Sequence, residues 1–122
     1  MKFLLIMHMN PAVWDGLTEA ERKAVMAGHE GFITEVTESG ELLGTQALGD
    51  PSTSAVVRVR DGVPVVTDGP YAEVKEYLGG FYHIDVDSRE RALELAAKIP
   101  DAAVDGLGVE VRPVMFAAGP DL

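Results

Sequence analysis

The chain has 122 residues, of which 47% are hydrophobic, so it is long and apolar enough to form one domain with a buried core. Its 20 acidic and 10 basic side chains give a formal net charge of -10 at pH 7, which disfavours binding to nucleic acid and to anionic membranes. The absence of cysteine excludes disulfides, thiolate metal sites and a thiol nucleophile, and it fits a reducing, cytoplasmic location.

The first third of the chain alternates strand, helix and strand. Residues 2–9 form a nearly continuous apolar run that predicts a buried strand, and residues 10–16 are expected to form a loop. Residues 17–40 predict a helix that Thr18 caps with Glu21 in a capping box. Val25, His29 and Phe32 fall on one side of this helix, which from Val25 onward is largely apolar. Residues 41–48 predict a second strand.

The rest of the chain predicts a hairpin, a strand, a helix and a last strand. Valines alternate with arginines before Asp61-Gly62, which predicts a hairpin over residues 55–67 with a type I′ turn. Residues 68–78 then interrupt the pattern with a turn and a short helical piece, and a strand resumes at residues 79–86. Ser88 caps a helix over residues 89–99, and residues 109–116 read as the final strand.

This order predicts an α+β fold of the ferredoxin-like type, β-α-β-β-β-α-β with an inserted hairpin. We expect one domain over residues 1–116 and an irregular tail over residues 117–122. Helices would cover only one face of such a sheet. The other face needs a partner, and a second copy is the symmetric solution, so we expect a homodimer.

The stretch "DGPYAEVKE" at residues 68–76, followed by "LGGFY", resembles the signature of YCII-related proteins of the DGPFAETKE type. Tyr71 replaces the phenylalanine of that signature and Val74 its threonine. The Trp14 loop, the segment around His29, the hairpin and the closing strand also fit this type. The resemblance implies a dimeric α/β barrel and a pocket with a His–Asp pair. Some relatives of this type accompany extracytoplasmic-function sigma factors.

His29 is the strongest candidate for a catalytic residue. A neutral imidazole on a largely apolar helix face can act as a general acid or base when an acceptor orients one ring nitrogen. Asp68, where a strand meets the interrupting segment, is the candidate partner. The structural alternative is a core histidine bonded to a carbonyl, with Asp68 capping its own turn.

Five further residues are candidates for binding a substrate between sheet and helix. Gly69 and Pro70 force a turn, which is a sufficient structural reason for their presence. The aromatic candidates also have a structural alternative, in the core or at a subunit contact, and they are Trp14, Tyr71 and Phe81. The spacing of the histidines matches no metal motif, and no glycine-rich loop supports a nucleotide cofactor, so we expect neither.

Two functions remain open from the sequence. The first is a cofactor-free acid/base enzyme, an isomerase, lyase or hydrolase, that acts on an unidentified small molecule. The second is a non-catalytic ligand-binding or regulatory dimer linked to an extracytoplasmic-function sigma factor system. Replacing His29 separates them, because only the enzyme would lose turnover while keeping its fold.

Overall fold

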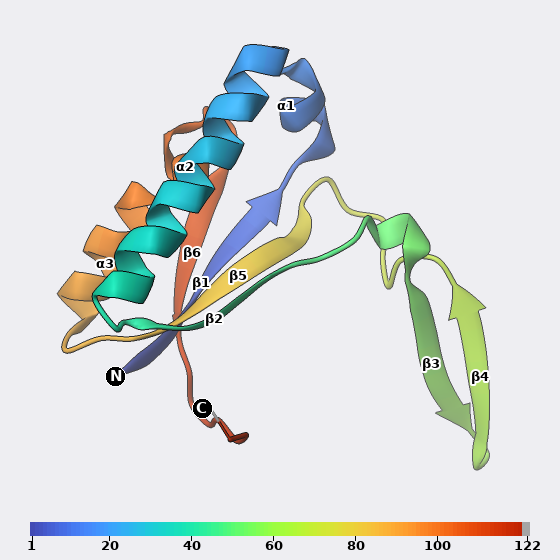
Figure 1. The fold of residues 1–122 in the computed structure, drawn as a ribbon. Helices are drawn as coiled ribbons and strands as arrows, with labels where there is room; N and C mark the ends of the chain where they lie inside the picture. The colour runs from blue at the N-terminus through green and yellow to red at the C-terminus, as the bar shows by residue number, and fades with distance from the viewer. Residues whose placement is uncertain (121–122) are drawn as a thin grey trace.

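A computed structural model describes residues 1–120 and shows a mixed α+β chain with two antiparallel sheets (Figure 1). The predicted order of major elements is confirmed. The helices are α1 Pro11–Gly16, α2 Glu19–Glu38 and α3 Arg89–Lys98, with 3-10 turns η1 Pro51–Thr53 and η2 Pro100–Ala103. The strands are β1 Lys2–Met9, β2 Leu42–Ala47, β3 Ala55–Arg60, β4 Val63–Asp68, β5 Tyr77–Asp85 and β6 Gly108–Pro113.

The larger sheet has the strand order β2-β5-β1-β6 and is covered by α2 and α3 on one face. Leu5 of β1 lies opposite Tyr82 of β5 and Val111 of β6, and the side chains of this row face the helices. The core cluster comprises Phe3, Leu5, Met7, Phe32, Val36, Tyr82, Ile84, Val86, Ala92, Leu95, Ala96 and Ile99.

Both long helices begin as their sequences predict. The Thr18 side chain accepts a hydrogen bond from the Glu21 backbone, and Glu21 bonds back to Thr18, which completes the capping box. Ser88 accepts from the Arg91 backbone and caps α3. The expected apolar side of α3 is confirmed except for Leu93, which is 40% exposed because it falls at the margin of the buried stripe.

Two local predictions were wrong. Residues 10–16 form helix α1 rather than a loop, because Asn10 accepts a hydrogen bond from the Ala12 backbone and Pro11 suits the first helical position. Residues 71–76 contain no helix, and β5 already starts at Tyr77. A segment this short lacks the length to nucleate a helix without packing partners.

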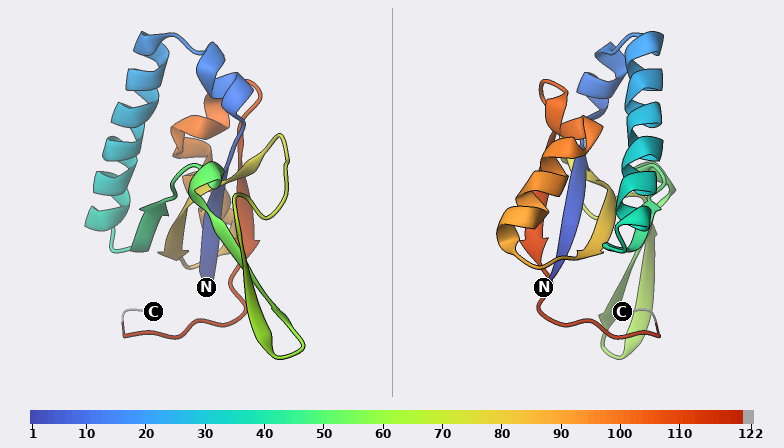
Figure 2. Two further views of the ribbon diagram at one scale, coloured as in Figure 1. Left: turned by 90° about the vertical axis from the view of Figure 1, so that its right-hand side faces the viewer. Right: turned by 60° about the vertical axis from the view of Figure 1, so that its left-hand side comes forward.

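Strands β3 and β4 form a two-stranded ribbon, here called the arm (residues 55–68), which projects from the body (Figure 1). It reaches past the end of the larger sheet in both views of Figure 2. The predicted turn is confirmed, since Asp61 and Gly62 have φ values of 50° and 78°. The register places Val57 opposite Val66, and both are exposed.

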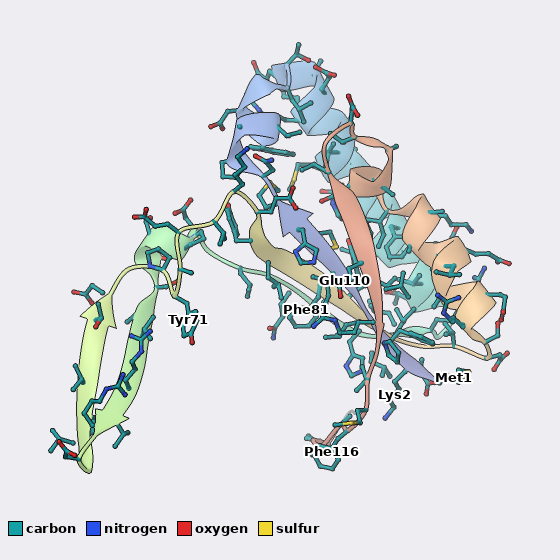
Figure 3. The ribbon with its side chains drawn as sticks, turned by 180° about the vertical axis from the view of Figure 1, so that it is seen from behind. Met1, Lys2, Tyr71, Phe81, Glu110 and Phe116 are labelled. Atoms are coloured by element: carbon teal, nitrogen blue, oxygen red, sulfur yellow. The ribbon has the colours of Figure 1, made fainter. Side chains whose placement is uncertain are left out.

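The face of the larger sheet opposite the helices, here called the open face, carries no element of the described chain. Phe81 and Glu110 lie on it in Figure 3, and Ile6 and His83 lie at its centre. Within residues 1–120 the sheet does not close into a barrel, because β2 and β6 remain its edges.

The irregular tail was predicted over residues 117–122. Residues 117–120 form no helix or strand, and residues 121–122 lie outside the described chain. Among the described residues, no helix combines the length and apolar character required to cross a bilayer.

Candidate functional site

A cavity of about 450 Å³ lies between α2 and the sheet, beside the point where β2 and β5 lead toward the arm. Helix α2 contributes Val25, Met26, His29, Glu30 and Ile33 to its wall. The strands contribute Met7, Met9, Thr45, Gln46, Ala47, Gly79, Gly80 and Tyr82, and Trp14, Leu48 and Asp101 complete the lining. Most of these side chains are apolar, which is typical of a site for a small organic molecule.

His29 is held at both ring nitrogens. Its Nε2 lies 2.7 Å from Oδ1 of Asp101, and its Nδ1 lies 2.6 Å from the Tyr82 hydroxyl. The Asp101 side chain is 5% exposed and that of His29 is 20% exposed. A carboxylate only accepts hydrogen bonds, so Nε2 carries a proton and donates a hydrogen bond to Asp101, and in the neutral ring Nδ1 accepts a hydrogen bond from Tyr82.

Tyr82 connects this histidine to the core. The Tyr82 side chain is buried, packs edge-on against Phe32 and stacks on the His29 ring at a centroid distance of 5.9 Å. Burial, and then the negative charge of Asp101, raise the pKa of the Tyr82 phenol to about 12. At neutral pH Tyr82 is therefore a phenol and can donate its proton to His29.

Gly28 allows the Asp101 carboxylate to approach His29. A Cβ atom at position 28 would lie 2.7 Å from Cγ of Pro100, the residue before Asp101. The absence of a side chain lets the η2 turn rest directly on α2, one residue away from His29. A glycine inside a helix costs about 0.5–1 kcal/mol relative to alanine, so close approach gives this one a physical reason.

The three side chains form a continuous hydrogen-bonded series, Asp101–His29–Tyr82, here called the relay. In one state the neutral His29 ring accepts the phenol proton of Tyr82. In the other the ring is an imidazolium that donates to both neighbours and is stabilised by the Asp101 carboxylate. The relay can thus take up or supply one proton at the cavity wall, which is the chemistry of general acid/base catalysis.

The carboxylate beside His29 in this chain differs from the one that the sequence suggested. Within this chain the carboxylate beside the ring belongs to Asp101, and Asp68 ends β4, where it is exposed and lies opposite Ala55. The strand that carries Asp68 is the returning strand of the arm, and it ends at the base of the arm instead of beside α2. The expected helix face of His29 itself is confirmed, with Val25, Phe32 and Val36 buried along it.

Of the five predicted substrate-binding residues, Trp14 lines the cavity. Gly69 adopts a positive φ of 103° and donates its backbone N–H to Ser54. Pro70 is exposed beside it, and the exposed Tyr71 ring lies under the Arg58 guanidinium, 5.4 Å from ring centroid to Cζ. Phe81 lies on the open face. These last four do not line this cavity in the single chain.

Sequence reasoning missed Asp101 and gave Tyr82 no role in catalysis. Asp101 stands in a segment that reads as an ordinary loop, and 72 positions separate it from His29. The one local signal was the placement of an aspartate directly after Pro100, at the end of a helix with a well-defined apolar side.

A second histidine forms a separate pair at the opposite face of the sheet. His8 Nε2 lies 2.6 Å from Glu110 Oε1, and this contact, followed by that of Arg112, lowers the pKa of the Glu110 carboxyl. Within residues 1–120 no three histidine or acidic side chains gather with the geometry of a metal site.

Comparison with known proteins identifies the relatives of this chain. The family model described as "YCII-related domain" matches residues 1–117. A protein of Rhizobium meliloti (strain 1021), named "Uncharacterized protein R00369", is 31% identical over 114 residues, which are 93% of this chain and 92% of that protein. On the strength of the match over residues 1–117 and of this relative, the chain belongs to the YCII-related domain family.

Proposed function

We propose that this chain is a homodimeric small-molecule-binding protein whose cavity performs general acid/base chemistry without a cofactor. The observation that carries the proposal is the relay at the wall of a largely apolar cavity. An isomerase, lyase or hydrolase acting on an activated substrate lies within reach of such a group, since positioned proton transfer contributes roughly a hundred- to ten-thousand-fold in rate.

The proposed proton path starts at the Tyr82 hydroxyl oxygen. When a substrate gives up a proton to this oxygen, the phenol proton passes to Nδ1 of His29, and the resulting imidazolium is held by Asp101. The reverse path returns a proton to the same or another substrate atom. Because the pKa of Tyr82 is raised to about 12, a free phenolate does not accumulate at neutral pH, and the two transfers are coupled.

The catalytic proposal can be tested with 5-nitrobenzisoxazole, an uncharged reporter of general bases. A base removes its ring C–H proton while the N–O bond breaks, and the coloured product is 2-cyano-4-nitrophenolate, so no co-reactant is needed. We expect turnover that falls at least tenfold in His29→Gln and in Tyr82→Phe. His8→Gln and Tyr77→Phe should retain it, because neither residue touches the relay.

The alternative is a ligand-binding dimer without catalysis, in the regulatory setting that the resemblance suggests. It is favoured by the fact that both nitrogens of His29 already have partners within the protein. If the reporter binds in the cavity and the wild type turns it over no faster than the His29→Gln variant, the binding function stands and the catalytic one fails.

The proposed homodimer has a ferredoxin-like fold in each subunit and the open faces packed together as a dimeric α/β barrel. His83 supports this, because it is buried on the open face while its Nε2 atom has no hydrogen-bond partner among the described residues. Burial, and then the charge of Lys2, lower the pKa of His83, so it enters the interface as a neutral ring. Phe81 would meet the second copy there.

The arm also supports a second copy. An isolated two-stranded ribbon is marginally stable in water, yet Val57, Val59 and Val66 share one exposed face with Pro64. We propose that this face packs on the partner subunit. In this arrangement the base of the arm holds the loop that follows β4 at the rim of the cavity. The residues at this base are Asp68, Gly69, Pro70 and Tyr71. The cysteine-free composition suits assembly in a reducing, cytoplasmic compartment.

Two matched substitutions test the role of the arm. Val66→Asp places a charge on the apolar face, whereas Val63→Asp places the same charge on the other face, opposite Arg60. In sedimentation experiments the wild type and Val63→Asp should both have twice the chain mass, and Val66→Asp should dissociate at least tenfold more readily. A monomeric wild type at high concentration would contradict the dimer, and equal behaviour of both variants would contradict the arm contact.

A further inference from the structure

The cavity wall is apolar over most of its surface. Trp14, Met7, Met9, Met26 and Ile33 provide aromatic, thioether and aliphatic contacts. Methionine side chains adapt their shape to flat or irregular molecules, and a tryptophan offers a stacking surface. A ligand that fills this space therefore gains mainly from burying its own apolar surface.

The relay supplies one group of polar atoms in the wall, and Glu30, Thr45 and Gln46 add further polar side chains. Tyr82 offers an oxygen lone pair to the cavity while its proton is donated to His29. In the imidazolium state of His29, the Tyr82 oxygen accepts from the ring and its own proton becomes free to donate. The relay can thus receive or give one hydrogen bond to a ligand, and it does so beside a largely apolar wall.

The charges of the wall exclude anions. Its titratable side chains are His29, Glu30, Tyr82 and Asp101, and among the described residues neither lysine nor arginine lines the cavity. A bound carboxylate or phosphate would lose its hydration and meet Glu30 and Asp101, while the His29 imidazolium is already paired with Asp101, which is strongly unfavourable. A ligand cation does not gain a buried partner either, because the Asp101 carboxylate already binds His29 and the other carboxylate of the wall, Glu30, is exposed to water.

We infer that the cavity takes an uncharged, largely apolar small molecule whose single polar group meets Tyr82 and His29. This assignment rests on the proposed ligand-binding function and adds the chemical class of the ligand. The relay then acts at the polar end of the ligand, and the tryptophan and methionine wall holds the remainder. Neutral carbonyl, amide and phenol compounds with an aromatic ring belong to this class.

Three probes of nearly equal size and different charge test the class at pH 7: 2-naphthamide, 2-naphthoate and 2-naphthylmethylammonium. Trp14 is the only tryptophan among the 122 residues, so its indole N–H gives one unambiguous NMR signal at the cavity. The methyl groups of Met7, Met9 and Met26 report on the same wall, while Met115 is 99% exposed and serves as an internal control.

We expect 2-naphthamide to shift the Trp14 and cavity methionine signals, to leave Met115 in place, and to bind at least tenfold more tightly than either ion. Tighter binding of 2-naphthoate or of the ammonium compound at the same signals would overturn the neutral class and leave the ligand site standing. If no probe shifts these signals at millimolar concentration, the inferred class is wrong. The 5-nitrobenzisoxazole assay then decides separately whether the relay is catalytic.

Discussion

Replacing Gly28 by alanine should destabilise the protein by about 1–3 kcal/mol, although alanine is the better helix former. The added Cβ would lie 2.7 Å from Cγ of Pro100, so the η2 turn must move away from α2. Asp101 follows Pro100 directly and would lose its contact with His29. Urea unfolding gives the change in stability, and ¹⁵N NMR of the imidazole shows whether Nε2 still carries the proton.

Gly31 provides the matched control for this substitution. It lies in the same helix, and a Cβ atom there would have no neighbour within 4 Å. Gly31→Ala should therefore stabilise the protein by about 0.5–1 kcal/mol and leave the proton on Nε2 of His29. Equal gains in stability for both variants, with an unchanged His29 spectrum, would show that Gly28 does not position Asp101.

Alkaline pH should remove about 2–3 kcal/mol of stability through Tyr82 alone. The pKa of its phenol is about 12 in the folded protein, against 10.0 for an unperturbed tyrosine. Between these two values the folded chain binds more protons at this site than the unfolded chain. The Tyr82 contribution is therefore fully present below pH 10 and is lost as pH rises toward 12.

The comparison of wild type with Tyr82→Phe isolates this effect from other groups that titrate in alkali. The free energy of unfolding of both proteins is measured from pH 9 to the highest pH at which unfolding stays reversible. The difference between them should shrink as pH rises. Tyr77→Phe is a useful second comparison, because burial raises the pKa of Tyr77 as well, with Asp50 and Asp15 contributing. A constant difference between wild type and Tyr82→Phe would contradict the raised pKa of Tyr82.

Local patterns were sufficient to predict most of the helices, strands and turns. The apolar run of β1, the Thr18 capping box and the Asp61-Gly62 turn each act over a few residues, and all three are found in the structure. The helix α1 was missed because a six-residue helix depends on a cap and a proline rather than on periodicity. The helical piece expected after Pro70 was too short to form by itself.

The candidate site could be predicted only in part, because its geometry depends on contacts between distant segments. The periodicity of α2 placed His29 toward the sheet, and Trp14, a candidate for a cavity between sheet and helix, lines the cavity. The choice between Asp68 and Asp101 depends on where the arm leaves the body and on how closely η2 packs against Gly28. Neither fact is visible as a local pattern, because a hairpin has the same alternation of apolar and polar residues whether or not it packs against its own chain.

The central position of β1 has a consequence for the order in which the chain can fold. β1 is made before the other strands, but its two neighbours are β5, residues 77–85, and β6, residues 108–113. During synthesis its apolar residues therefore have no strand to pair with until most of the chain has left the ribosome. Pairing between such distant segments is slow, and an unpaired apolar strand is prone to aggregate. A nascent chain of this protein must keep its first strand shielded from other molecules until the last ones are made.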